Sequence, residues 1–210
     1  MRAVIFDWRG TLVLAPTFRG WVAEALRRLG RDPAAVDDLV RRLVENRIDV
    51  PGVDADAALH RETYYRGFTA AGLDDELADS LYAVESDPAF TPFAVDAAAT
   101  LTALRDGGVR IGVLSDIHFD VRPAFAGLPV DAFVLSFEHG VVKPDPAVFR
   151  IALEELGTDP AETLMVGDRS THDGAAVECG MPTLLVPPLR DVRDARLRLV
   201  TLLAGGATGR

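Results

Sequence analysis

Short, uninterrupted apolar runs alternate along the chain with stretches of helical periodicity, and this pattern predicts the fold. Five runs rich in β-branched residues stand at 3–6, 109–114, 132–135, 163–166 and 183–186. Continuous apolar runs are typical of strands buried on both faces of a parallel sheet. Helical periodicity covers residues 95–106, 146–156, 174–179 and 190–203. Strands that alternate with helices predict an α/β fold with a Rossmann-like, doubly wound parallel sheet.

Residues 15–89 break this rhythm, because no strand-like run occurs there. Apolar residues recur at helical spacing in four stretches, and Pro and Gly residues separate the stretches. We interpret residues 15–89 as an all-helical domain, inserted after the first strand of an α/β core domain that comprises residues 1–14 and 90–210. The last seven residues, AGGATGR, are predicted to form a frayed tail.

Composition narrows the class of protein. The chain has 210 residues, 49% of them hydrophobic, which is enough to bury a core and excludes a disordered protein. A net charge of −10 argues against nucleic acid as a partner. No apolar run approaches the roughly 18–20 residues that span a bilayer, and Asp7 and Arg9 interrupt any N-terminal signal peptide. With a single cysteine, Cys179, the sequence predicts a cytoplasmic protein and leaves its oligomeric state open.

Polar side chains follow the predicted strands at their carboxyl ends, the edge where open parallel sheets bind ligands. Asp7 follows the first strand, Ser115 the second, and Lys143 comes after the third. Asp168 and Asp173 follow the fourth strand. Lys143 is the only lysine among 22 basic residues, and the other 21 are arginines. Three carboxylates, a hydroxyl and this single ammonium predict an active site at one edge of the sheet.

Four short patterns surround these residues and occur in the order FDWRGTL, VLSD, VVKPDP and VGDRSTHD. With these motifs the chain resembles the haloacid dehalogenase (HAD) superfamily over nearly its whole length. In that resemblance the helical insertion corresponds to a C1-type cap domain. The superfamily is dominated by magnesium-dependent phosphatases. The resemblance therefore implies a hydrolase of a small phosphorylated metabolite, with Mg²⁺ as its cofactor.

The same resemblance implies a role for each motif residue. Asp7 is the implied nucleophile, which becomes an aspartyl-phosphate, and a carboxylate ionised at pH 7 suits this task. Ser115 would donate to a phosphoryl oxygen, and Asp116 beside it would contact the substrate. Lys143 would orient Asp7 and offset phosphoryl charge. The implied Mg²⁺ ligands are hard oxygens, namely Asp7, the backbone carbonyl of Arg9, Asp168 and, through water, Asp173.

Arg9 departs from the phosphatase pattern. It occupies the position of the Asp that protonates the leaving group and then deprotonates water. A guanidinium cannot accept a proton, and acid–base assistance is typically worth ~10²–10⁴-fold in rate. Arg9 can instead bind a substrate phosphate or carboxylate, or bridge to Asp7 or Asp173 and block the pocket. Replacement of Arg9 by Asp is expected to raise phosphatase activity.

Alternatives to a phosphatase follow from Arg9. A catalytically silent protein that binds a phosphate or a metabolite is the main one. The 2-haloacid dehalogenases also lack the second Asp of the first motif, but they lack the first Asp of the fourth motif too, which is present here as Asp168. Phosphonoacetaldehyde hydrolases share the Asp-Trp-x-Gly-Thr pattern but need a cap lysine, and residues 15–89 contain none.

Histidines and one tryptophan near the motifs leave further questions. His118 and His172 fall in loops at the catalytic edge, where either could replace the missing acid–base group. A surface loop is the simpler interpretation for both. Trp8 either shapes the leaving-group pocket or packs in the core.

Overall fold

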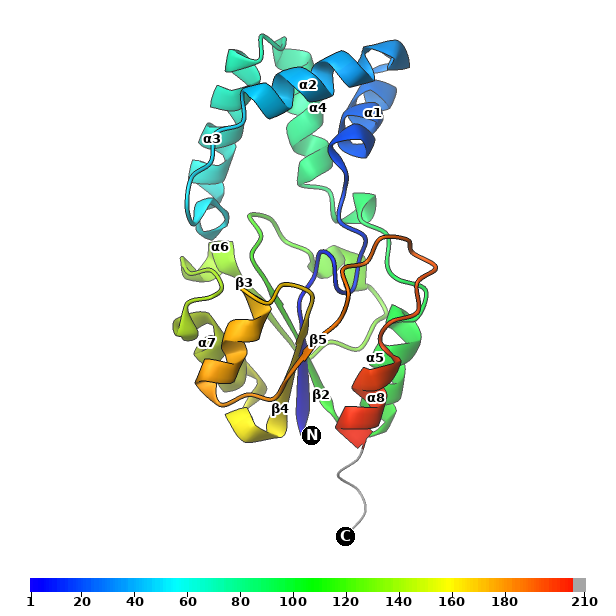
Figure 1. Ribbon diagram of the computed structural model, residues 1–210, viewed down its shortest axis with the longest axis vertical. Helices are drawn as coiled ribbons and strands as arrows, with labels where there is room; N and C mark the ends of the chain where they lie inside the picture. Colours follow the sequence, from blue (N-terminus) through cyan, green and yellow to red (C-terminus); the bar gives the residue numbers. More distant parts are fainter. Residues whose placement is uncertain (206–210) are drawn as a thin grey trace.

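The structure, a computed structural model, describes residues 1–205, and a five-stranded parallel sheet forms its centre (Figure 1). The strands are β1 (Ala3–Phe6), β2 (Arg110–Ser115), β3 (Ala132–Leu135), β4 (Thr163–Gly167) and β5 (Thr183–Leu185). Their order in the sheet is β3-β2-β1-β4-β5, so the chain winds outward in both directions from the central strand β1. The predicted doubly wound α/β fold is confirmed.

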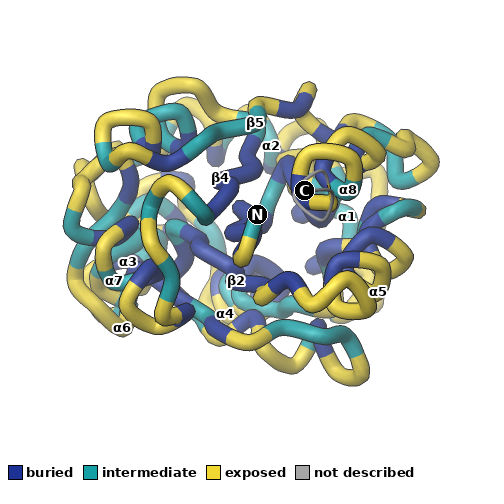
Figure 2. Tube along the Cα trace, turned by 90° about the horizontal axis from the view of Figure 1, so that it is seen from below, coloured by how far each residue is buried: buried dark blue, intermediate teal, exposed yellow. Residues whose placement is uncertain are grey.

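Helices cover both faces of the sheet because the central strand is apolar on both sides. Val4 and Phe6 of β1 pack in one hydrophobic cluster with α5 (Ala97–Asp106) and α8 (Arg198–Gly205). Ala3 and Ile5 point the other way and pack with α7 (Pro146–Leu156) and the 3₁₀ helix η6 (Asp173–Cys179). The short helix α6 (Ser136–His139) follows β3. Figure 2 shows buried strands at the centre and helices with exposed outer faces around them.

Trp8 belongs to the core of the sheet region. Its side chain is fully buried, and its ring packs against those of Phe93 and Phe125 at centroid distances of 5.4 and 5.0 Å. Of the two interpretations left open by the sequence, core packing is therefore the one that the structure favours.

We expect Trp8→Ala to lower the free energy of unfolding by about 3–5 kcal/mol, because it removes a large buried ring and leaves a cavity. Urea unfolding followed by circular dichroism measures this loss. Val177→Ala is the control, since Val177 is 61% exposed and a surface change of this kind costs less than about 0.5 kcal/mol. Equal losses for the two variants would contradict a structural role for Trp8.

Residues 15–89, called the helical segment below, contain α1 (Phe18–Leu29), α2 (Val36–Glu45), the 3₁₀ turn η2 (Val53–Ala55), α3 (Ala57–Ala70) and α4 (Asp75–Glu85). These helices bury a hydrophobic cluster of their own, in which the indole N–H of Trp21 donates to the Leu81 carbonyl at 2.7 Å. The helical segment lies above the carboxyl edge of the sheet (Figure 1). The domain boundaries at residues 15 and 89 stay a prediction.

None of the helices in residues 1–205 combines the length and the apolar character needed to cross a membrane.

The helix predicted at residues 190–203 is wrong over its first part, because α8 begins only at Arg198. The Asp191 carboxylate accepts from the backbone N–H of Arg193 at 2.9 Å, and that of Asp194 accepts from the N–H of Asp191 at 3.2 Å. Such side-chain bonds compete with helical ones for the same backbone groups. Of the predicted tail, Ala204 and Gly205 belong to α8, and residues 206–210 lie outside the described residues.

Candidate active site

The motif residues lie at the carboxyl ends of neighbouring strands. Asp7 comes directly after β1 and Asp168 directly after β4, and these two strands pair in parallel register. Ser115 is the last residue of β2, which pairs with β1 on the other side. Lys143 lies in the loop between α6 and α7. The sheet therefore brings Asp7 and Asp168 together although they are 161 positions apart in the sequence.

Lys143 is the centre of this group. Its ammonium donates to Asp7 Oδ1 and to Asp173 Oδ1, both at 2.6 Å, and its side chain is only 2% exposed. Burial works against the charged ammonium, yet the carboxylates of Asp7 and Asp173 raise the pKa of Lys143 above its usual range. Lys143 therefore stays protonated and holds the two carboxylates in place.

Neighbouring opposite charges offset the burial of the carboxylates less fully than they offset the burial of Lys143. Burial raises the pKa of Asp7 to about 6, because the Lys143 charge only partly opposes desolvation and the negative charge of Asp173 adds to it. Burial and the Asp173 charge also raise the pKa of Asp168. Three carboxylates thus face one ammonium. A further cation at this point would favour the ionised form of each acid.

Asp7, Asp168 and Asp173 can hold that cation. One oxygen from each carboxylate lies within 4.8 Å of the others. The Thr11 hydroxyl lies 3.0 Å from Asp7 Oδ2 and 3.3 Å from Asp168 Oδ1, so it helps to position two of these donors. Hard oxygen donors grouped in this way fit Mg²⁺, which prefers carboxylates and retained waters.

Two glycines make room for the carboxylates. A Cβ at Gly10, whose φ of +90° is itself unfavourable for other residues, would lie 2.7 Å from a carboxylate oxygen of Asp168. At Gly167 a Cβ would lie 2.2 Å from the Asp173 carboxyl carbon.

The backbone of Arg9 is in the turn after Asp7, where it forms a bridge with Val13. The Arg9 carbonyl as a metal ligand stays a prediction.

Ser115 ends β2, and Asp116 follows it directly. Ser115 is buried at the strand end. The Asp116 carboxylate accepts from the backbone N–H of Lys143 at 2.9 Å, a contact that the sequence did not predict. Asp116 therefore links the loop that carries Lys143 to the end of β2. The contacts of Ser115 and Asp116 with a substrate stay predictions.

Arg9 pairs with the helical segment. Its guanidinium donates to the Glu85 carboxylate at 2.6 Å and to the Glu85 backbone carbonyl at 2.9 Å, and it lies 5.5 Å from the ring centroid of Phe119. Among the described residues, no ion pair joins Arg9 to Asp7 or Asp173. Glu85 was missed because a glutamate at a helix end ordinarily indicates a solvated position, whereas it is only 8% exposed.

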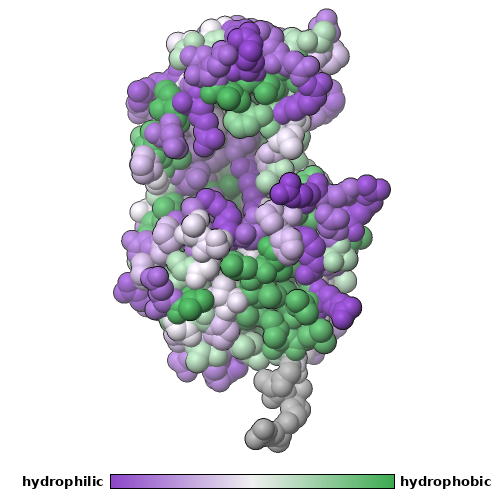
Figure 3. Space-filling view, viewed as in Figure 1, coloured by the Kyte–Doolittle hydropathy of each residue, from purple (hydrophilic) through white to green (hydrophobic). Residues whose placement is uncertain are grey.

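A cavity of about 560 Å³ lies between the helical segment and the sheet. Figure 3 shows the notch between the upper and lower parts of the molecule on this side. Basic and acidic side chains both line it, namely Arg9, Arg47, Lys143 and Arg169 together with Asp49, Asp54, Glu85 and Asp116. Its size suits a small molecule that has polar or charged groups.

Ser136, the first residue of α6, joins the two parts of the molecule directly. Its hydroxyl oxygen accepts from the backbone N–H of Ile117 at 2.8 Å. It also lies 2.6 Å from the carbonyl of Asp54 in the helical segment and 3.0 Å from the carbonyl of Ile117. The loop that follows Ser115 therefore shares a hydrogen-bonded contact with the helical segment.

The expectation that His118 lies on a surface loop is wrong. His118 is 4% exposed because the ring of His60, from the helical segment, stacks on it at a centroid distance of 3.3 Å. Burial lowers the pKa of His118 to about 2 and that of His60 to about 4. Both rings are neutral at pH 7. His172 is half-buried and contacts Arg169 at 2.7 Å.

Residues 1–180 match the model of the haloacid dehalogenase-like hydrolase family. A phosphoglycolate phosphatase from Yersinia pestis is 31% identical over 192 residues, which cover 88% of this chain and 80% of that protein. The (S)-2-haloacid dehalogenase 4A of Burkholderia cepacia is 25% identical over 198 residues, with 89% and 83% covered. A solved 2-haloacid dehalogenase from Pseudomonas syringae has a TM-score of 0.65 at 25% identity, covering 93% of this chain and 90% of that one.

Proposed function

The chain belongs to the haloacid dehalogenase-like hydrolase family, and on that premise we propose that it is a Mg²⁺-dependent phosphatase of a small phosphorylated metabolite. The convergence of Asp7, Asp168 and Asp173 carries this proposal. Three carboxylates around one ammonium are suited to a divalent cation, which a phosphoryl site uses to offset charge on the transferred group. Asp168 is the residue that the resemblance assigns to phosphatases and not to dehalogenases. The phosphatases among the similar proteins agree with this choice.

The chain's own residues perform the covalent step. The Asp7 carboxylate attacks the phosphorus, the bond from phosphorus to the ester oxygen breaks, and the alcohol leaves with a proton taken from solvent. Water then attacks the aspartyl-phosphate, which releases inorganic phosphate and restores the Asp7 carboxylate. Lys143 fixes Asp7 Oδ1 at 2.6 Å, so the other oxygen, Oδ2, faces Thr11 and is the nucleophilic atom in this proposal.

Arg9 determines which substrates turn over fast. It is bound to Glu85 and supplies no proton to the leaving group. Phosphate esters whose leaving groups are stable as anions need no such proton. The proposed enzyme therefore favours acyl, enol or aryl phosphates over simple alkyl phosphates. The helical segment, acting as the cap, limits the substrate to one that fits the cavity of about 560 Å³.

Hydrolysis of an activated aryl phosphate tests the proposal. We expect Mg²⁺-dependent release of phosphate by the purified chain, loss of turnover on chelation, and recovery when Mg²⁺ is restored. Asp7→Asn should reduce the rate to that of the uncatalysed reaction, because an amide does not form the mixed anhydride. Asp106→Asn, at an exposed position on α5, is the matched control and should keep full activity.

Two outcomes would contradict the proposal. If no phosphate ester in a broad panel gives turnover that depends on Asp7, the silent binding protein is the better explanation. If metal-free protein releases halide from a 2-haloacid, the dehalogenase alternative holds.

A further inference from the structure

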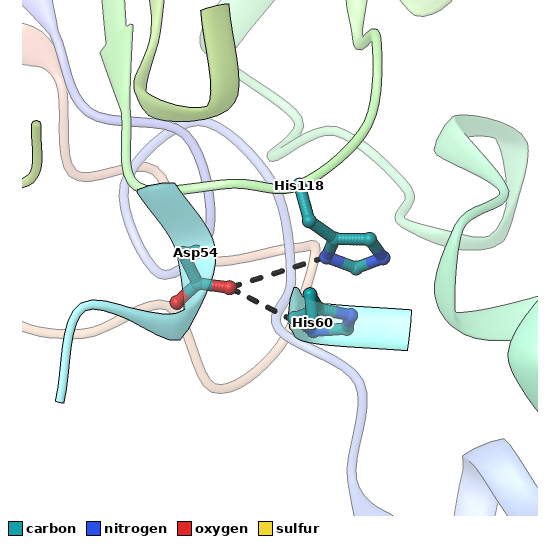
Figure 4. Close-up of side chains that lie close together, drawn as sticks. All are labelled: Asp54, His60 and His118. Carbon is teal, nitrogen blue, oxygen red and sulfur yellow. Dashed lines mark ion pairs between the residues drawn. The ribbon is translucent and has the colours of Figure 1, made fainter. Parts of the chain in front are cut away.

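A second group of metal-binding side chains lies where the helical segment meets the sheet (Figure 4). Asp54 comes from η2, His60 from α3, and His118 from the loop after β2. Asp54 Oδ1 lies 3.7 Å from His60 Nε2 and 4.0 Å from His118 Nδ1. Neighbouring donors of a tetrahedral ion with bonds of about 2.0–2.1 Å lie about 3.3–3.4 Å apart. Asp54 Oδ1 thus lies roughly 0.3–0.7 Å beyond ligand spacing from the two ring nitrogens, and all three donors lie within 4.8 Å of one another.

Hydroxyl groups hold the outer nitrogen of each ring. His60 Nδ1 lies 3.2 Å from the Tyr82 hydroxyl, and His118 Nε2 lies 3.0 Å from the Ser86 hydroxyl. When each hydroxyl oxygen accepts the ring N–H, the nitrogens that face Asp54 keep their lone pairs. Histidines that bind metals are oriented by such an outer partner, which also sets the tautomer.

The two imidazoles are buried, whereas the carboxylate is open to the cavity. Both histidine side chains are 2% exposed, and imidazole binds metals in its neutral form. The Asp54 side chain is 40% exposed and borders the cavity, so an ion can enter there and keep a water ligand. The rings lie parallel, with 9° between their planes. Binding of one ion by both rings would require them to turn out of this stack about the Cβ–Cγ bond, a torsion with a broad energy minimum.

We propose that Asp54, His60 and His118 form a second cation site, selective for a transition-metal ion such as Zn²⁺, which joins the helical segment to the sheet. Two imidazoles and one carboxylate suit Zn²⁺ better than Mg²⁺, which prefers oxygen donors alone. The site shares no residue with the Asp7, Asp168 and Asp173 group. A test that contradicts the phosphatase proposal would therefore leave this proposal unaffected.

Titration with Zn²⁺ tests this site. The full chain is stripped of metal with a chelator and titrated with Zn²⁺ in excess Mg²⁺, which keeps the three-carboxylate site occupied. We expect one tightly bound Zn²⁺ per chain by calorimetry and by metal analysis. Asp54→Asn and His118→Gln should weaken binding by more than the ~10–100-fold expected for loss of an outer partner, as in Ser86→Ala. His139→Gln, at an exposed histidine, is the matched control and should bind Zn²⁺ as the wild type does.

A second readout separates loss of the site from loss of the fold. Zn²⁺ should raise the unfolding temperature of the wild type and of His139→Gln, but not that of Asp54→Asn. Asp54 is partly exposed, so this variant should fold even if His118→Gln does not. Equal Zn²⁺ affinity in the wild type and Asp54→Asn would overturn the proposal. Zn²⁺ binding that is lost in Asp168→Asn and kept in Asp54→Asn would overturn it as well.

Discussion

Replacement of Lys143 by methionine is expected to abolish phosphatase turnover and to lower the free energy of unfolding by about 3–5 kcal/mol. The Lys143 ammonium is the shared partner of Asp7 and Asp173, each at 2.6 Å, and all three side chains are buried. Methionine fills similar space but leaves two buried carboxylates without their cation. Urea unfolding at pH 7 without added metal measures the loss of stability, and the aryl phosphate assay measures the loss of turnover.

Two further variants are compared with Lys143→Met. Arg2→Met breaks an exposed ion pair with Glu162, 3.4 Å long, and such pairs contribute about 0–1 kcal/mol. Asp173→Asn added to Lys143→Met removes one of the stranded charges and should restore part of the stability, but not the turnover. If Lys143→Met costs no more than Arg2→Met, the ammonium does not offset the buried carboxylates in the way described.

The double variant Arg9→Asp/Glu85→Gln is expected to raise kcat/KM toward alkyl phosphates by roughly 10²-fold or more, within the ~10²–10⁴-fold range of acid–base assistance. Asp at position 9 would supply the proton that an alkoxide leaving group needs. The second substitution is needed because Arg9 is bound to a buried Glu85. Arg9→Asp alone would place two carboxylates together, so its gain should be smaller. This prediction rests on the proposed phosphatase activity.

Comparison of an aryl with an alkyl phosphate identifies the cause of any increase in kcat/KM. The rate with an aryl phosphate should change little, since its leaving group departs without protonation. Glu85→Gln alone removes the partner of Arg9 but adds no acid, so it should not speed up alkyl phosphates. If the double variant hydrolyses alkyl phosphates no faster than the wild type, Arg9 serves another purpose in this enzyme.

The sheet and its catalytic edge could be predicted from the sequence because their signals are local. Each strand is a continuous apolar run, and parallel strands present their carboxyl ends at one edge. This geometry puts Asp7 at the same edge as the segments after β3 and β4, which carry Lys143 and Asp173, and the structure places Lys143 in contact with both carboxylates. The turn at residues 190–197 escaped prediction because Asp191 and Asp194 bond to nearby backbone groups, which apolar periodicity does not register.

Contacts between the helical segment and the sheet could not be predicted in the same way. Arg9 and Glu85 are 76 positions apart, and their pairing depends on how α4 docks over the sheet edge. Helical periodicity indicates which face of a helix is apolar, but not which distant loop meets the polar residues at its end. The stacking of His60 on His118 depends on the same docking. Polar residues at such a junction are therefore found only once the packing of the two parts is known.

The Ser136 hydroxyl gives the contact between the two parts an alternative acceptor. It carries one hydrogen and has two carbonyl acceptors in reach, that of Asp54 at 2.6 Å and that of Ile117 at 3.0 Å. If the contact with Asp54 were broken, the hydrogen could point to the Ile117 carbonyl, and water could hydrate the Asp54 carbonyl. No buried donor would be left unpaired, so the Ser136 contact adds little resistance to separation of the two parts. The Arg9–Glu85 ion pair spans the same junction, so it and not Ser136 dominates the polar cost of separation.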